Sequence, residues 1–189
     1  MPIIEGTLQT DTEVAAECAD LAAFSCGDGR LPAAEDDVNA IVAELHGGDY
    51  PDAVLRVTRE MPVGTLVGIA AIEPRKGPII DHPVIPEKDN EDAAYVVVLT
   101  LSGGYRGSYT CKDGRPLSEV LVLEALRYLV TENDGAIPPV QAVIARANTP
   151  SREMVERYGF VNPIETIGDR FYIRARNLPL PSGTAGTVP

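Results

Sequence analysis

The segment from Ser102 to Pro116, SGGYRGSYTCKDGRP, places glycines and positive charges directly before a helical pattern. Glycine lets the backbone approach a ligand closely, and Arg106 and Arg115 can make charge-assisted hydrogen bonds to phosphate. The N–H groups at the start of a helix carry partial positive charge and favour anions. The segment therefore suits a pyrophosphate, although a purely structural turn explains the glycines equally well.

Other ligand chemistries find less support. A Gly-Lys-Ser/Thr P-loop and the G-x-G-x-x-G spacing of a dinucleotide fold are both absent, which disfavours ATP, GTP and NAD. The cysteines, Cys18, Cys26 and Cys111, form neither a paired zinc motif nor C-x-x-C. We expect reduced thiols and no metal site.

The net charge of −12 argues against a nucleic-acid partner, because binding to a phosphate backbone needs clustered Lys and Arg. An acidic surface can attract a cationic amine, or it can simply maintain solubility. The first residues, MPIIEGTLQTDTEV, contain no basic segment before an apolar run, and no apolar run reaches the roughly 18 residues of a membrane span. We expect a soluble, cytoplasmic protein with no membrane contact.

The glycine-bearing segment lies between elements that the hydrophobic pattern predicts clearly. A continuous apolar run, Ala93 to Leu101, is typical of a central strand covered on both faces. Apolar residues at helical spacing predict a helix over Leu117 to Val130, and a short strand follows over Val140 to Ala145. Strand, loop, helix and strand form a βαβ-like crossover, in which ligands bind at the carboxyl ends of the strands.

The helix that follows has clear end signals. Thr149 is the expected N-cap, Pro150 suits the first helical position, and Gly159 can end the helix. Further elements are predicted as follows: a strand over Ile3 to Leu8, a helix from Asp11 to about Phe24, a helix from Glu35 to Leu45, a hairpin of Ala53 to Arg59 with Thr65 to Ile72, and a hairpin of Val161 to Ile167 with Arg170 to Ala175. We expect a single domain over 1–177, a proline-broken arm or lid inserted at 73–92, and a disordered tail at 178–189.

Three motifs, taken in order, resemble the GNAT superfamily of acyl-CoA-dependent N-acyltransferases over about a third of the chain. The family pattern L-x-V-x-P-x-x-R-G corresponds to Leu99–Gly107, with Gly103 in place of proline. The G-x-x-L-L-x-x-A-L helix start corresponds to Ser118–Leu126. The N-x-x-A…Y-x-x-x-G-F element corresponds to Asn148, Ser151 and Gly159-Phe160.

The resemblance implies an α/β (α+β) fold with a mixed, splayed central sheet of about six or seven strands and helices on both faces. It also implies acetyl-CoA (coenzyme A) as cosubstrate, with the pantetheine arm in the splay and the pyrophosphate on the loop before the helix. The implied cofactor-binding residues are Leu99, Leu101, Arg106, Gly107, Gly114, Arg115, Ser118, Asn148 and Ser151. The implied reaction is transfer of an acetyl group to a small-molecule or peptide amine; whether the protein is a homodimer stays open.

Two departures from the family pattern leave a second reading open. The segment SYTCKDG enlarges the loop, and Val155 occupies the position of the tyrosine that often acts as general acid. A catalytically silent acyl-CoA-binding or protein-interaction module with the same fold is the alternative. For the enzyme, the attacking amine must lose a proton, and the candidate bases are Asp92, His82 and Glu73.

Overall fold

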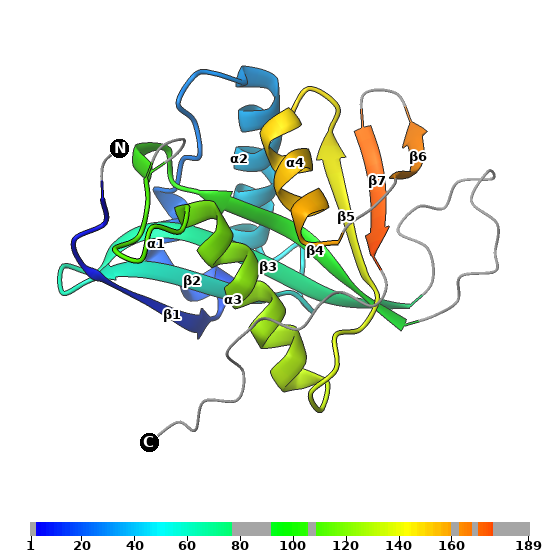
Figure 1. The fold of residues 1–189 in the computed structure, drawn as a ribbon, viewed down its shortest axis with the longest axis horizontal. Helices are drawn as coiled ribbons and strands as arrows, with labels where there is room; N and C mark the ends of the chain where they lie inside the picture. Colours follow the sequence, from blue (N-terminus) through cyan, green and yellow to red (C-terminus); the bar gives the residue numbers. More distant parts are fainter. Residues whose placement is uncertain (1–2, 77–91, 106–108, 160–162, 168–169, 176–189) are drawn as a thin grey trace.

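The computed structural model describes residues 3–76, 92–105, 109–159, 163–167 and 170–175. Its centre is a mixed sheet with the strand order β1-β2-β3-β4-β5-β7-β6 (Figure 1). The strands are β1 Thr7–Glu13, β2 Val54–Met61, β3 Thr65–Lys76, β4 Asp92–Leu101, β5 Val140–Ala145, β6 Pro163–Ile167 and β7 Arg170–Ala175. The helices are η1 Ala15–Glu17, α1 Ala19–Ala22, α2 Pro32–Gly47, η2 Gly103–Tyr105, α3 Leu117–Glu132 and α4 Thr149–Arg157.

Helices cover both faces of this sheet. On one face, α2 packs through Val42 and Leu45 onto a core that includes Leu55 and Ile69. On the other face, the buried side of α3 packs onto Ile72 and its neighbours, and α4 joins the same core. Figure 1 shows α3 in front of the strands and α2 behind them. The predicted α+β architecture, with a mixed sheet and helices on both faces, is confirmed.

The two long helices form where hydrophobic periodicity predicts them. In α3 the buried residues Leu121, Ala125 and Leu129 recur every four positions, so one stripe of the helix faces the core. In α2 the last turn ends at Gly48, whose φ of 86° is a left-handed conformation that glycine adopts without strain.

The sheet splays between β4 and β5. These two strands are parallel and pair only at Ala94 with Val140, Tyr95 with Gln141 and Val96 with Ala142. Beyond Val96, the pairing of β4 with β3 shifts register, so that one extra β4 residue, Val97, lies opposite no β3 partner. A β-bulge of this kind bends its strand, and beyond Val96 β4 no longer pairs with β5. The predicted splay is therefore present, and it begins at the bulge.

The N-terminal segment differs from its prediction. The first strand covers Thr7–Glu13 and pairs with β2 along its whole length, from Thr7 with Met61 to Glu13 with Leu55. The residues expected to start a helix, Asp11 to Glu13, belong to this strand, because they continue its pairing with β2 as far as Leu55. The long helix predicted up to Phe24 is reduced to η1 and the single turn α1.

The predicted arm at 73–92 also changes at its ends. β3 continues through Glu73 to Lys76, and β4 already begins at Asp92, with Lys76 paired to Asp92. The proline at position 74 is tolerated within β3, opposite Ala94 of β4. Residues 77–91 and the tail at 178–189 lie outside the described residues, so the arm, the tail and the division into domains stay predictions.

The cap of α4 is one residue earlier than predicted. Asn148, not Thr149, precedes the helix, and its side-chain oxygen accepts a hydrogen bond from the Ser151 N–H at 3.3 Å. An asparagine in this position satisfies one of the N–H groups that a helix start leaves without a partner. The end of the helix is as predicted, because Gly159 follows it with a φ of 90°.

Candidate functional site

A cavity of about 440 Å³ occupies the splay between β4 and β5. Its strand walls are Tyr95–Leu99 of β4 and the β5 residues from Val140 to Ala145 apart from Gln141. Helices from both faces of the sheet complete it: α3 and α4 on one side, and α2 on the other. The cavity therefore reaches through the sheet at the point where the two strands part.

The β-bulge changes the directions of three consecutive β4 side chains that line this cavity, Val97, Val98 and Leu99. In a regular strand, Val97 and Val98 would point to opposite faces, but both belong to the core under α2. Leu99 packs instead against the core under α3. The bulge thus gives the cavity an apolar lining toward both helical layers.

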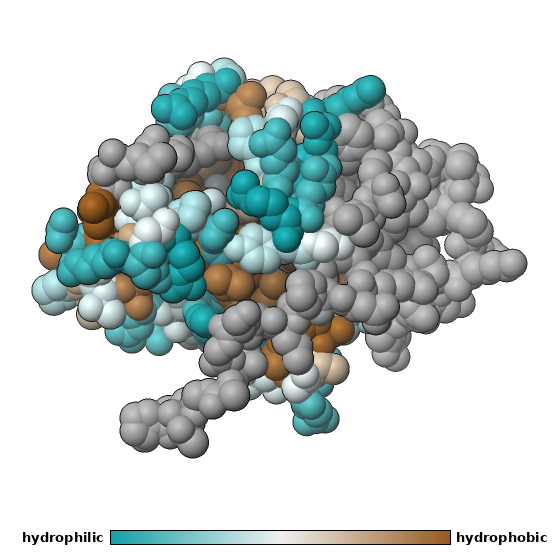
Figure 2. All heavy atoms as spheres, viewed as in Figure 1, coloured by the Kyte–Doolittle hydropathy of each residue, from teal (hydrophilic) through white to brown (hydrophobic). Residues whose placement is uncertain are grey.

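The α4 wall supplies the polar groups that the sequence motif predicts. Asn148 and Ser151 both line the cavity, from the N-terminal turn of α4. Met154 and Val155 line it one turn further on. The motif position at which the family often carries a tyrosine thus faces the cavity as Val155, so the described wall presents no acid there. Figure 2 shows the outer surface of α4 as hydrophilic, which fits an amphipathic helix with one face on the cavity.

Leu99 and Leu101, the two β4 residues predicted to bind the cofactor, lie in different places. Leu99 lines the cavity. Leu101 lies past the splay and packs with Ile4, Val67 and Leu117 in a separate core beside the N-terminal segment. Only Leu99, Asn148 and Ser151 of the predicted set are among the described residues that line the cavity.

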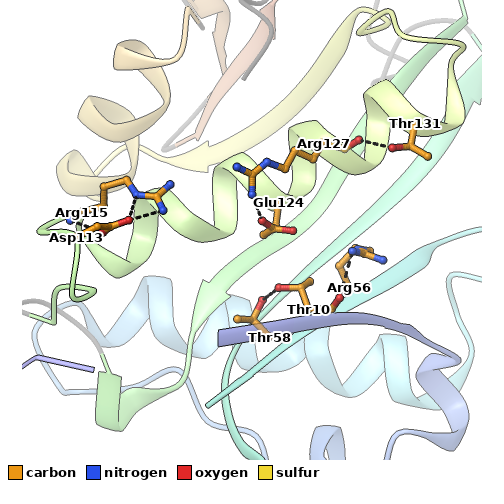
Figure 3. A network of polar contacts seen from close by, with 8 residues as sticks. All are labelled: Thr10, Arg56, Thr58, Asp113, Arg115, Glu124, Arg127 and Thr131. Atoms are coloured by element: carbon orange, nitrogen blue, oxygen red, sulfur yellow. Dashed lines mark hydrogen bonds and ion pairs between the residues drawn. The ribbon is translucent and has the colours of Figure 1, made fainter. Parts of the chain in front are cut away.

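The loop before α3 is held closed by its own hydrogen bonds. The Gly114 N–H donates to the Cys111 carbonyl and the Cys111 N–H to the Arg115 carbonyl, each at 2.8 Å. The Arg115 guanidinium is turned onto Asp113, whose Oδ2 accepts from Nε at 2.7 Å (Figure 3). The bond to Arg115 holds the pKa of the Asp113 carboxyl below its usual range. The charge of Arg115 is thus already matched within the loop.

The start of α3 is partly satisfied by the same loop. The Leu117 N–H donates to the Tyr109 carbonyl and the Glu119 N–H to the Pro116 carbonyl, both at 3.0 Å. Ser118 is half-buried in this first turn and does not line the cavity. Arg106 and Gly107 lie outside the described residues. The pyrophosphate position on Gly114, Arg115 and Ser118 stays a prediction.

Gly103 shows why this chain departs from the family's proline. A Cβ at Gly103 would lie 2.3 Å from the Gly27 carbonyl oxygen, a distance that no real contact reaches. The Gly103 N–H also donates to the Ser25 carbonyl at 2.7 Å, and proline has no N–H to donate. The loop after β4 is therefore docked on the loop before α2, which requires glycine.

The loop before α2, on which the loop after β4 docks, is itself held by a buried carboxylate. Glu35 is 5% exposed, and its two oxygens accept from the Gly29 N–H at 3.0 Å and the Leu31 N–H at 3.2 Å. The sequence predicted one acidic helix start from Glu35, Asp36 and Asp37, but Glu35 alone of the three is buried.

The predicted bases do not converge on the cavity among the described residues. Asp92 begins β4, at the end of the strand remote from the splay. Glu73 is half-buried on β3 and pairs in register with Tyr95, which does line the cavity. His82 lies outside the described residues. The three base assignments stay predictions; of the two candidates that the structure describes, Glu73 lies nearer to the cavity by register.

Sequence reasoning missed two ionisable residues of the cavity wall, Asp37 of α2 and Tyr95 of β4. A signal for Asp37 was present: Ala34, Asp37, Val38 and Ile41 follow the i, i+3, i+4, i+7 spacing of one helix face. The helix face that lines the cavity therefore carries one acid among apolar residues.

Tyr158, at the end of α4, packs beside the cavity core but does not line the cavity. Burial raises the pKa of Tyr158, and the neighbouring Glu119 carboxylate raises this pKa further. The Tyr158 phenol therefore keeps its proton at neutral pH. It lies three residues after Val155, the motif position, and does not face the splay.

Several solved structures have a fold similar to that of this chain. A bacterial toxin matches with a TM-score of 0.64 at 13% identity, covering 90% of each chain. AtaTR bound with acetyl-CoA matches at 0.58 and 12%, covering 88% of this chain and 93% of that one; AtaT is also solved with acetyl-methionyl-tRNAfMet. The PaiA N-acetyltransferase from Thermoplasma acidophilum, in complex with coenzyme A, matches at 0.53 and 13%, covering 90% and 99%.

A further match, with a TM-score of 0.52 at 16% identity, is described as an acetyltransferase of the GNAT family from Desulfovibrio desulfuricans. The chain therefore has the fold of the GNAT acetyltransferases. No family model matches the sequence, and no curated protein does so either. None of the helices in the described part of the chain is long and apolar enough to cross a membrane.

Proposed function

We propose that the protein is an N-acetyltransferase that moves the acetyl group of acetyl-CoA to a primary amine by direct attack. The observation that carries this proposal is the apolar cavity that opens through the sheet where β4 and β5 part. A cavity of this size is within the range of small-ligand sites, and its elongated strand walls suit an extended arm rather than a compact ligand. The coenzyme A and acetyl-CoA complexes of proteins with the same fold support the choice of cosubstrate.

In this proposal the pantetheine arm lies between the parted strands, with Asn148 and Ser151 on one side and Leu99 on the other. The thioester then reaches the bulge at Val97. A main-chain N–H near Leu99 would donate to the thioester carbonyl, whose oxygen gains negative charge in the transition state. A preorganised donor of this kind typically lowers the activation barrier by about 3 kcal/mol.

The reaction balances without a metal or a covalent enzyme intermediate. The neutral amine nitrogen attacks the thioester carbon, a C–N bond forms, and the C–S bond breaks. The proton lost by the amine leaves through a base or water, and the thiolate collects a proton. Because a thiol has a pKa of about 8.5, the thiolate is a workable leaving group even with Val155 in place of an acid; the missing acid would cost about 10²-fold or more in rate.

A catalytically silent acyl-CoA-binding module is the second candidate, and a specific observation favours it. Val155 faces the cavity at the acid position, and Arg115 is matched by Asp113 instead of being open to a phosphate. The acceptor question is also open. The net charge of −12 disfavours nucleic acid, whereas the AtaT complex with acetyl-methionyl-tRNAfMet shows that the fold can engage it, so an aminoacyl-tRNA belongs in the acceptor panel.

The test combines binding with turnover. Titration calorimetry with acetyl-CoA should show one site, and Ser151→Trp, which fills the cavity wall, should abolish the binding. Glu153→Trp is the matched control, because Glu153 is exposed on the same helix and does not line the cavity. Release of free thiol with a panel of amines should separate the two candidates. Binding without turnover would favour the silent module, and equal binding by both tryptophan variants would place the cofactor elsewhere.

A further inference from the structure

The cavity has two ends of unlike chemistry. Toward α4 its polar groups are neutral, Asn148 and Ser151. Toward α2 they are an acid and a phenol, Asp37 and Tyr95. Every other described lining residue is apolar, so Asp37 is the only carboxylate on the described wall. The two ends lie on opposite sides of the parted strands, because α2 and α4 cover opposite faces of the sheet.

The α2 face that lines the cavity is otherwise hydrophobic. Ala34 is buried, Val38 and Ile41 are half-buried, and all three line the cavity with Asp37. Asp37 is itself exposed, which places its carboxylate at the rim, where water and an incoming ligand can reach it. An apolar strip that ends in a carboxylate is complementary to a molecule with an apolar body and a cationic head.

Tyr95 shares this end of the cavity. Its ring packs with the core under α2, on the strand residue two before the bulge at Val97. An aromatic ring favours a nearby cation over its face and also offers flat apolar area to a carbon chain. Asp37 and Tyr95 thus present the two features that recognise an amine on an apolar group, close to the point where β4 and β5 part.

The helix dipole does not explain why Asp37 in particular faces the cavity. Acidic residues in the first turn of a helix are stabilised by the helix dipole, but that effect falls off beyond the first turn. Asp37 is the sixth residue of α2, past that turn. Asp36 carries the same charge one position earlier and does not line the cavity. The dipole therefore does not distinguish the residue that faces the cavity from the one that does not.

We infer that Asp37 binds the amino group of the acceptor, and that the acceptor is a small primary amine on an apolar or aromatic body. This inference rests on the proposed acetyl transfer. The apolar body lies along Val38 and Ile41 and against the Tyr95 ring, while the acetyl thioester arrives from the α4 end.

The proton balance of the reaction runs through water. An amine enters as its ammonium form, which has no lone pair with which to attack. Asp37 holds the ammonium at the cavity, and one ammonium proton passes to water, which yields the neutral amine. The neutral amine then attacks the thioester, loses a second proton to water as the C–N bond becomes an amide, and the departing thiolate takes up one proton.

The experiment compares Asp37→Asn with Asp36→Asn, which removes the same charge one residue away from the cavity. Two measurements are made on each: the dissociation constant for acetyl-CoA, and kcat/KM for n-hexylamine and phenethylamine followed by thiol release. We expect Asp37→Asn to keep the acetyl-CoA affinity within about twofold. Its kcat/KM for both amines should fall roughly tenfold or more, as for loss of a hydrogen bond to a charged group. Asp36→Asn should match wild type, and Asp37→Glu should recover part of the lost rate.

The outcomes separate the two proposals. If wild type does not bind acetyl-CoA, the proposed function fails and the inference falls with it. If wild type binds acetyl-CoA and acetylates other amines of the panel but neither of these two, the acceptor class is wrong; if it acetylates no amine at all, the proposed function fails. If both amines are acetylated and Asp37→Asn is as fast as wild type, or if Asp36→Asn loses as much, then Asp37 does not contact the acceptor.

Discussion

The cavity between β4 and β5 and the loop that follows β4 adjoin in sequence but are organised by different forces. The cavity is walled by apolar side chains and owes its shape to a bulge and to strands that stop pairing. The loop is held by hydrogen bonds, to Ser25 through Gly103, to Glu60 through Tyr105, and internally through Asp113 and Arg115. Open space suited to a ligand arises where pairing ends, whereas the polar groups of the loop are largely matched to one another.

The contrast bears on the phosphate question. A compact phosphate loop leaves its N–H groups pointing at the ligand, but here the Leu117 and Glu119 amides already donate to loop carbonyls. The cavity has the apolar walls expected around a pantetheine arm, whereas these two N–H groups are not free to bind a pyrophosphate. Three changes test this difference, in order of decreasing effect.

The largest effect is expected from Gly103→Ala. The new Cβ would meet the Gly27 carbonyl oxygen at 2.3 Å, so one of the two loops must shift. We expect a loss of about 1–3 kcal/mol in the free energy of unfolding, as for other overpacked sites, measured by urea denaturation. Gly104→Ala is the control, since its Cβ would have no atom within 4 Å. Equal stability of the two variants would mean that the loops do not dock as described.

A smaller effect is expected from Asn148→Ala, on the cavity side of the comparison. The change removes the acceptor of the Ser151 N–H at the start of α4. We expect a loss of about 1 kcal/mol, typical of a helix N-cap, together with weaker acetyl-CoA binding. Asn148→Asp should keep the stability, because aspartate caps helices equally well. A stable Asn148→Ala variant would show that the Ser151 amide has another acceptor.

The smallest effect is expected from Tyr105→Phe, on the loop side. The Tyr105 hydroxyl donates to the Glu60 carboxylate at 3.0 Å, and Glu60 also accepts from the Gly6 N–H at 2.9 Å. Loss of one such bond should cost at most about 1 kcal/mol near neutral pH. It should leave acetyl-CoA binding unchanged if the loop and the cavity are independent.

The same residue predicts a pH dependence. Burial raises the pKa of Tyr105, and the bond to Glu60 and the charge of Glu60 raise it further. A phenol with a raised folded-state pKa contributes stability that is present below its unfolded pKa of about 10 and is lost as pH rises above it. Tyr128 and Tyr158 have raised pKa values in the same direction. Urea denaturation should therefore show wild type losing more stability between pH 8 and pH 10.5 than Tyr105→Phe; parallel losses would contradict the assignment.

Much of the frame could be predicted because it depends on local periodicity. The run from Ala93 to Leu101 and the helix from Leu117 have apolar patterns that only a covered strand and a covered helix satisfy, and both lie where expected. The N-terminal strand was misplaced, since its mostly polar residues carry a weak hydrophobic signal and its pairing partners on β2 lie more than 40 residues away in the sequence.

The site divides in the same way. Asn148 and Ser151 could be named from a motif because the helix start and the cavity wall are one local feature. The helix face of Asp37 could be predicted from spacing, but its place at the site could not, because Asp37 meets the cavity only through the packing of α2 across the opposite face of the sheet. The residues from Gly114 to Ser118 were grouped as a cradle from their composition, but their hydrogen bonds run within the loop.

By itself, the amino-acid sequence determined the order of strands and helices, the central position of β4 and the apolar character of its surroundings, because each follows from side-chain periodicity within a dozen residues. Only the tertiary structure decided where the sheet opens and which side chains meet there. The opening depends on one unpaired residue, Val97, and on two strands ceasing to pair. Register between distant strands and the packing of helices from both faces are long-range properties that no local pattern encodes.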